Sequence, residues 1–347
     1  MKNLLRKIYN KWKFFKANIF PSYFISSPFW SSIYYLFFSS EFRRETHAVL
    51  SGRVKHLKDA KKAKSSFYTL IRNIHRIEKG LLMRPRREVF ATEFIKETVD
   101  NFETLFEPLK CTIDSQMKWA YDVLSEYFKV TGSHIIVDRQ RERFKNIIMA
   151  FTQDGVTSIP YFRLEKNRPD ITYDDFYKLT KFRRSVRWFL NKRVPHDLID
   201  KAILAANQSP SACNRQPFEY RIIDDPELLN TVVNIPMGIK GYQNNVPAIV
   251  VVVGNLDAYF AEQDRHVIYV DASLANMSFM LALETLGLAS CSINWPDIEA
   301  LESRMEKALK LEKYQRPIMC MAVGFPDPEG MVAYSEKRDI DLLRKYN

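Results

Sequence analysis

The sequence predicts an α+β fold for its second half, a mixed sheet covered by helices, preceded by a mainly α-helical region. Residues 247–254 and 316–325 are short apolar runs bounded by turn formers, a pattern typical of buried strands. Between them, residues 267–286 have the length and apolar content of one long helix. This alternation of strand and helix patterns indicates a single mixed α and β unit.

The first 40 residues differ in character from the rest of the chain. Residues 1–20 place apolar side chains on one helical face and Lys and Arg elsewhere, which predicts a basic amphipathic helix. Residues 17–40 carry no charge, but Pro21 and Pro28 interrupt the apolar run that a membrane-spanning helix needs. We expect an interfacial or self-packed segment and no cleaved secretory signal. Two alternatives stay open: contact with an anionic membrane surface, or packing on the protein's own body or across a dimer.

A helical region is predicted from residue 41 to about residue 151. One apolar stripe runs through residues 67–77 and another through residues 94–105, each at helical spacing. The alternating charges of residues 138–143 indicate a solvated helix face. Residues 152–174 are polar and contain Gly and Pro, so they indicate a linker. The predicted units are residues 1–40, a basic amphipathic and aromatic segment; 41–165, the helical region; and 166–347, the α+β domain.

Composition limits the classes of site that the chain can hold. The 347 residues are 46% hydrophobic and 27% charged, which describes a globular protein with room for a sizeable core. Four cysteines show neither metal-ligand nor redox-pair spacing, so a reduced, cytoplasmic protein is expected. Six scattered histidines give no support for a catalytic triad or a metal site. We therefore predict no metal and assign no side chain as the catalytic group.

The net charge of +11 is concentrated in the N-terminal part of the chain. Residues 1–100 contain 21 Lys and Arg against 8 Asp and Glu, a balance of +13, so residues 101–347 carry −2. An anionic partner is therefore expected to bind near the N-terminus. No recognisable nucleic-acid-binding motif accompanies this charge, and nucleic acid is not the expected partner.

Two short runs carry the functional prediction. Arg183, Arg184 and Arg187 lie with Ser185 within five residues, and such a cluster suits a phosphate dianion through charge-assisted hydrogen bonds. Residues 209–217, Ser-Pro-Ser-Ala-Cys-Asn-Arg-Gln-Pro, form a turn after a helical segment. Its short side chains and free backbone groups allow close approach to a flat ring.

These two runs, about 25 residues apart, resemble the nitroreductase family of flavin enzymes. Residues 271–290 are similar to the family's long central helix and the turn that ends it, and Tyr334-Ser-Glu-Lys-Arg338 is similar to its terminal basic pair. The resemblance covers roughly residues 175–347. It implies a helix-covered sheet, FMN as the cofactor, and a homodimer with FMN at the interface between the subunits.

The resemblance also implies roles for individual residues. Arg183, Ser185 and Arg187 would contact the cofactor, and a cation near its N1 and O2 edge would stabilise the anionic reduced flavin. Ser211 and Asn214 would come from the opposite subunit, with Gln216 as a weaker candidate, and Lys240 is an extra candidate ligand. The loop of residues 290–294 would approach N5 and O4, although Asn294 stands where many relatives carry an acidic residue. The full implied set is Arg183, Arg184, Ser185, Arg187, Pro210, Ser211, Ala212, Asn214, Ser292, Ile293, Lys337 and Arg338.

The implied activity is a ping-pong oxidoreductase in which NAD(P)H delivers a hydride to flavin N5. The electrons then pass to an oxidised or electron-poor acceptor such as a nitro compound or a quinone. The alternative is a degenerate, nitroreductase-like binding or scaffold protein in a biosynthetic pathway for cell-surface polysaccharide. A peripheral location at the inner face of the membrane is expected only if residues 1–40 bind lipid.

Overall fold

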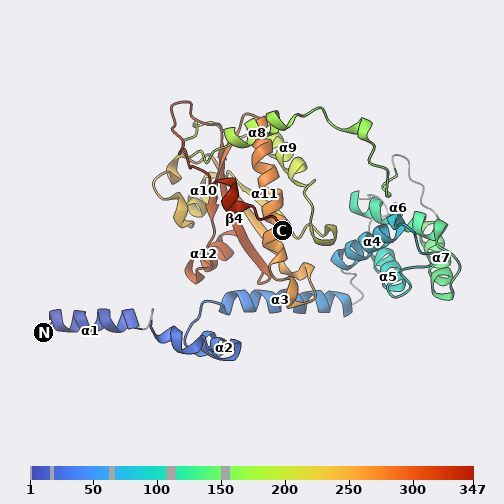
Figure 1. The fold of residues 1–347 in the computed structure, drawn as a ribbon, viewed down its shortest axis with the longest axis horizontal. Coiled ribbons are helices and arrows are strands. Elements are labelled where there is room, and N and C mark those ends of the chain that lie inside the picture. Colours follow the sequence, from blue (N-terminus) through green and yellow to red (C-terminus); the bar gives the residue numbers. More distant parts are fainter. Residues whose placement is uncertain (1, 16–18, 62–66, 107–114, 150–156) are drawn as a thin grey trace.

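A computed structural model describes residues 2–15, 19–61, 67–106, 115–149 and 157–347 (Figure 1). The described part has an α+β fold, as the sequence predicts. The helices are α1 (Lys2–Phe14), α2 (Pro28–Phe37), α3 (Arg43–Lys61), α4 (Phe67–Leu82), α5 (Ile95–Phe106), α6 (Ser115–Val130), α7 (Ile135–Ile148), α8 (Tyr173–Phe182), α9 (His196–Ala206), α10 (Pro226–Val233), α11 (Val267–Thr285), α12 (Glu299–Leu309) and α13 (Ile340–Leu343). The strands are β1 (Phe218–Ile223), β2 (Ala248–Asn255), β3 (Ala289–Asn294) and β4 (Gln315–Gly324).

The sheet has the strand order β1-β2-β4-β3, and these neighbours pair antiparallel. A parallel bridge between Ser185 and Ser290 adds the mixed character that the sequence predicts. Two details of the sheet differ from expectation. Residues 290–294 lie in strand β3 rather than in a loop, because they pair in register with β4. Strand β1 follows the predicted turn and was not anticipated.

Strand β2 lies at the centre of the core, and its Ala-Ile-Val-Val-Val-Val sequence is buried on both faces. Val250 and Val252 face the core shared with α9 and α11, whereas Val251 and Val253 face the core shared with α10 and α12. A strand that is covered on both sides has no polar face, which explains its continuous apolar run. Helix α11 packs on the face of the sheet that contains Val250 and Val252 (Figure 1).

Helix α3 packs on the C-terminal unit although it lies within the predicted helical region. Ala48 is buried in the same core as α11, and a Cβ on Gly52 would lie 2.6 Å from the backbone of Leu256. Arg44 also forms ion pairs with Glu299 and Glu306 of α12. The division of the chain at residues 40 and 165 stays a prediction. Helix α3, however, shares the core of the C-terminal α+β unit rather than that of the helical region.

Helices α4 to α7 form a bundle with a separate core (Figure 1). Both predicted apolar stripes are confirmed, since Leu70, Ile74, Val99 and Phe102 are fully buried there. The bundle reaches the C-terminal unit through α4, which contacts the 3-10 turn η5 (Ala212–Asn214).

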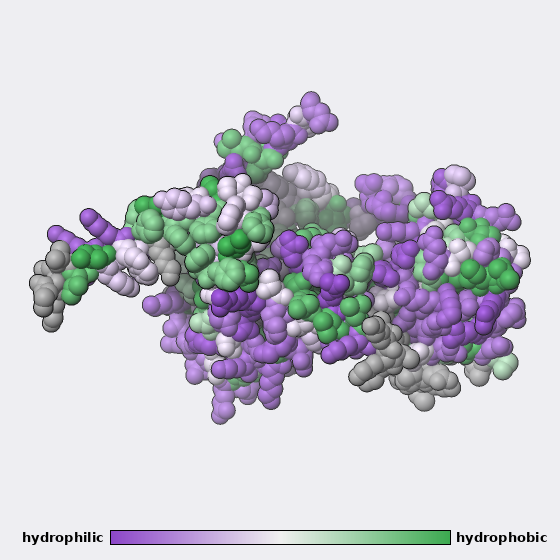
Figure 2. Space-filling view, turned by 90° about the horizontal axis from the view of Figure 1, so that it is seen from below, coloured by the Kyte–Doolittle hydropathy of each residue, from purple (hydrophilic) through white to green (hydrophobic). Residues whose placement is uncertain are grey.

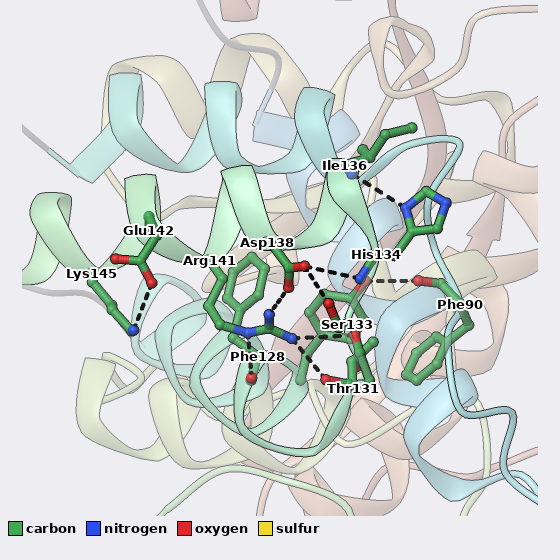
Figure 3. A network of polar contacts seen from close by, with 12 residues as sticks. Phe90, Phe128, Thr131, Ser133, His134, Ile136, Asp138, Arg141, Glu142 and Lys145 are labelled. Atoms are coloured by element: carbon green, nitrogen blue, oxygen red, sulfur yellow. Dashed lines mark hydrogen bonds and ion pairs between the residues drawn. The ribbon is translucent and has the colours of Figure 1, made fainter.

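The prediction of a solvated face at residues 138–143 was incomplete. Asp138 accepts hydrogen bonds from the Ser133 hydroxyl and the His134 amide and pairs with Arg141 (Figure 3). The Arg141 guanidinium also donates to the carbonyls of Phe128 and Thr131, at 2.9 and 2.7 Å. The two charged residues therefore satisfy the carbonyls at the end of α6 and fix the α6–α7 turn.

Candidate functional site

Hydrogen bonds of its backbone fix the arginine run at two points. The amide of Val186 donates to the Ser290 carbonyl at 3.1 Å, beside the Ser185–Ser290 bridge. Further along, Phe189 exchanges two hydrogen bonds with the Asn245 side chain, at 2.5 and 3.0 Å. The run is therefore joined to β3 at residues 185 and 186, whereas Phe189 pairs with Pro326, just after β4.

The guanidinium groups of this run form no ion pair with a carboxylate within the residues that the structure describes. Arg183 is half-buried, and its Nε has no hydrogen-bond partner there. Arg184 donates only to the Arg183 carbonyl, at 3.0 Å, and the exposed Arg187 donates to the Ser185 carbonyl and lies 6.0 Å from the Tyr242 ring centroid. Buried polar atoms without partners are rare in folded proteins. Unpaired cations beside an orphan Nε fit an anionic group such as the FMN phosphate.

A carboxyl group lies near this cluster without pairing to it. Burial raises the pKa of Glu284 to about 7, and the nearby Arg183 lowers it. Its Oε1 is buried and has no hydrogen-bond partner within the described chain. Near neutral pH this carboxyl is therefore only partly ionised, which limits how much of the arginine charge it neutralises.

Strand β3 brings a second predicted group to the same place. The buried Ser290 hydroxyl has no hydrogen-bond partner within the described residues, and Ser290 is itself the residue that forms the backbone bridge to Ser185. Two residues on, the Ser292 hydroxyl contacts the Met280 sulfur at 2.9 Å, and Ile293 is buried. The structure thus joins the arginine run to β3 at Ser290, two residues before Ser292, and the cofactor contacts of Ser292 and Ile293 stay predictions.

The turn at residues 211–216 has an unusual backbone. Cys213, Asn214 and Gln216 have positive φ values of 55°, 54° and 49°, a conformation that non-glycine residues rarely adopt. Side chains hold it in place: the Ser211 hydroxyl accepts from the Gln216 amide at 3.1 Å, and the buried Asp271 accepts from the Ala212 amide at 2.9 Å. Strain that surrounding contacts maintain in this way is typical of ligand sites.

Within one chain the two runs contact different parts of α11. The turn is bonded to Asp271 near the start of the helix, whereas Arg183 lies near Glu284 at its end. Thirteen residues of α-helix separate these positions, or about 20 Å. The turn and the arginine run are therefore not brought together within a single chain.

Other predicted residues lie outside both groups. Lys337 and Arg338 are in the exposed C-terminal segment, and neither side chain forms an ion pair within the described chain. Pro210 and Lys240 are exposed. Their proposed contacts with the cofactor stay predictions.

The structure adds residues that sequence reasoning missed. Arg215 is only 6% exposed, yet its guanidinium has no carboxylate within ion-pair distance in the described residues and lies over the Tyr259 ring at 5.0 Å. Arg72 of α4 lies over the Phe260 ring at 5.4 Å, close to the same turn. Arg215 belongs to the run of residues 209–217, which the sequence analysis identified, but it was not named there as a site residue. Nothing in the pattern around Arg72 connects it with a turn more than 130 residues away.

Comparisons with known proteins found matches in the second half of the chain. The model of the nitroreductase family matches residues 180–243 and 234–325. Iodotyrosine deiodinase 1 of Homo sapiens is 23% identical over 197 residues, which cover 49% of this chain and 67% of the relative. A protein of Methanothermobacter thermautotrophicus, named provisionally as an NADH dehydrogenase/NAD(P)H nitroreductase, is 28% identical over 158 residues, 44% of this chain and 78% of its own.

Solved structures of the family are also similar. An FMN-dependent nitroreductase from Clostridium difficile R20291 is 23% identical, covers 49% of this chain and 98% of its own, and has a TM-score of 0.42. A nitroreductase family protein from Streptococcus pneumoniae TIGR4 is 20% identical, covers 50% of this chain and 100% of its own, and has a TM-score of 0.43. The match to the family model places the similarity to the nitroreductase family in residues 180–325 of this chain.

Proposed function

We propose that this protein is an FMN-dependent oxidoreductase that uses NAD(P)H to reduce an oxidised or electron-poor small molecule. One observation carries the proposal: a run of three arginines, none paired with a described carboxylate, is fixed against β3 with a buried orphan Nε on Arg183. When bound, FMN supplies the hydride chemistry, exchanging a hydride with the donor and the acceptor in separate half-reactions.

The residues of the chain would bind and position the cofactor. Arg183 and the Ser290 hydroxyl offer buried donors to the phosphate, and Arg187 adds an exposed cation. The edge of β3 at Ser292 and Ile293 offers backbone groups beside the arginine run. Because the phosphate would neutralise cations that now have no carboxylate partner, its binding should stabilise the fold.

We also propose that the site is completed across a homodimer. The separation of the two runs along α11, about 20 Å, leaves the strained turn free to serve a second subunit. The outer side of α11 carries exposed Val270, Leu274 and Met277 next to the turn. An exposed apolar stripe on a helix is suited to burial against another subunit.

The relatives favour one acceptor class for early testing. Several matching proteins are named iodotyrosine deiodinase, and this name describes the removal of iodine from an iodinated phenol. Reductive dehalogenation of a halophenol is therefore a second candidate reaction, beside nitro and quinone reduction.

The test begins with the full chain as purified. Heat release followed by chromatography should identify FMN, and NAD(P)H oxidation should be measured with a nitroaromatic, a quinone and an iodophenol. Arg183→Ala/Arg187→Ala should remove most FMN binding, whereas Arg193→Ala, an exposed arginine that lies near Asp224, should not. Protein that neither contains nor binds FMN would overturn the proposal. Protein that binds FMN but reduces none of the acceptors would favour the scaffold alternative.

A further inference from the structure

Most of the exposed apolar side chains of the N-terminal helix α1 lie on one face. Leu5 and Ile8 are 61% and 56% exposed, and Tyr9 and Trp12 lie on the same face. At 100° per residue these four side chains and Phe15 span an arc of about 120°. The cations Arg6, Lys7, Lys11 and Lys13 lie outside that arc, and no Asp or Glu occurs before Glu41.

The segment after α1 is apolar and exposed without any charge. Tyr23, Ile25 and Phe37 are 67%, 76% and 68% exposed, and all lie in or beside η2 (Phe20–Phe24) and α2. Ring contacts of Phe20 with Phe24 and Phe38 hold the segment together as a folded unit. It is a preformed aromatic surface rather than a chain that must first fold.

Helix α3 extends this surface along the body of the protein. Phe42, Leu50, Val54 and Leu57 are exposed at helical spacing, and Phe42 and Leu50 also line a cavity of about 610 Å³ between α3 and the start of α11. In Figure 1, α1, α2 and α3 lie along one edge of the molecule. Figure 2, which looks onto that edge, shows apolar residues gathered over it.

We propose that this edge, formed by α1, η2, α2 and the outer side of α3, binds the surface of an anionic lipid bilayer. The charge pattern selects this occupant: cations flank the apolar arc of α1, as they do in helices that lie at the lipid headgroups. Three helices along one edge match a flat surface, and aromatic rings prefer the interfacial depth.

The proposed contact is peripheral rather than spanning. Among the described residues, one helix, 262–285, is long and apolar enough to cross a membrane. Much of that helix is α11, whose residues Ala272, Ala275 and Phe279 are fully buried in the core beneath the sheet. The edge formed by the first three helices contains no such span within the described chain.

Flotation of the full protein with vesicles tests the proposal without any redox assay. Binding to phosphatidylglycerol/phosphatidylcholine vesicles should exceed binding to pure phosphatidylcholine and should weaken as salt is added. Lys7→Gln/Lys11→Gln/Lys13→Gln should lower the partition coefficient on anionic vesicles by about 100-fold, at about fivefold per cation. Leu5→Ser/Ile8→Ser should lower it at least tenfold on the same vesicles.

A matched control uses exposed apolar residues on another part of the molecule. Leu82→Ser/Ile135→Ser removes comparable surface from the α4–α7 bundle and should leave vesicle binding unchanged. Light scattering tests the competing occupant, a second copy of the chain. Absence of the full protein from the floating fraction, or binding that both α1 variants leave intact, would overturn the proposal. Conversion of a larger assembly to a smaller one by Leu5→Ser/Ile8→Ser, with unchanged flotation, would assign the surface to the second copy.

Discussion

The proposed division of the cofactor site between two subunits can be tested by complementation. The arginine run and the strained turn lie about 20 Å apart along α11, so each subunit should contribute one run to each site. A variant that lacks the arginines and a variant that lacks the turn side chains should each fail to bind FMN as homodimers. A heterodimer of the two should contain one intact site, formed from the intact run of each subunit.

The expected losses follow from the burial of each group. The half-buried Arg183 should contribute about 2–3 kcal/mol through charge-assisted bonds, and the exposed Arg187 about 1 kcal/mol. Arg183→Ala/Arg187→Ala should therefore weaken FMN binding about 10²- to 10³-fold. Ser211→Ala/Asn214→Ala should weaken it about 30-fold, at about 1 kcal/mol for each neutral hydrogen bond.

The assay needs two affinity tags and one titration. The two variants are co-expressed, the heterodimer is isolated by tandem purification, and bound FMN is measured at a few times the native Kd. We expect about one FMN per heterodimer and little in either homodimer. A heterodimer as empty as both homodimers would refute the shared site. So would a Ser211→Ala/Asn214→Ala homodimer that retains full occupancy.

Three further predictions concern stability, measured by urea unfolding. Burial raises the pKa of Glu284 from the ordinary glutamate value of 4.5 to about 7, so its stabilising effect is complete below about pH 4.5 and is lost as pH rises through 7. Glu284→Gln should therefore stabilise at pH 8 by roughly 1–2 kcal/mol after discounting for solvent screening, and no gain at pH 8 would contradict this. Arg141→Ala should cost about 1.5–3 kcal/mol by freeing the carbonyls at the end of α6, whereas Lys145→Ala should change stability by less than about 0.5 kcal/mol; equal effects would argue against the network. Gly254→Ala places a Cβ 2.9 Å from Ile268 and should cost about 1–3 kcal/mol, and an unchanged midpoint would show that the helix can move away.

The sequence predicted elements whose pattern is set by burial. The β-branched run of β2 and the long apolar helix α11 were found because burial leaves little choice of residue type. The resemblance to the family implied a loop at residues 290–294, and the local sequence of β3, which begins Ala-Ser-Cys-Ser, has weak strand preference. Pairing with β4, a long-range contact, makes it a strand.

The site residues that belong to local sequence patterns were predictable, and those that depend on long-range packing were not. Arg183 and Ser211 stand in short local patterns, and a local pattern is visible in one sequence. The contact of α4 with the turn, and the buried position of Arg215, depend on tertiary packing between distant segments. Arg141 shows the same limit over a shorter distance. Its partners include backbone carbonyls, which every residue has, so the sequence does not indicate which carbonyls it contacts.

The contact between α4 and the turn at residues 212–214 joins the bundle to the proposed cofactor site. A ligand that holds the turn in its left-handed conformation also holds the surface on which α4 rests. By thermodynamic linkage, a free-energy gain at the turn then adds to the stability of the bundle, and loosening of the bundle reduces affinity at the turn. The stability of the α4–α7 bundle and the affinity for the cofactor are thus coupled, so that a change in one shifts the other in the same direction.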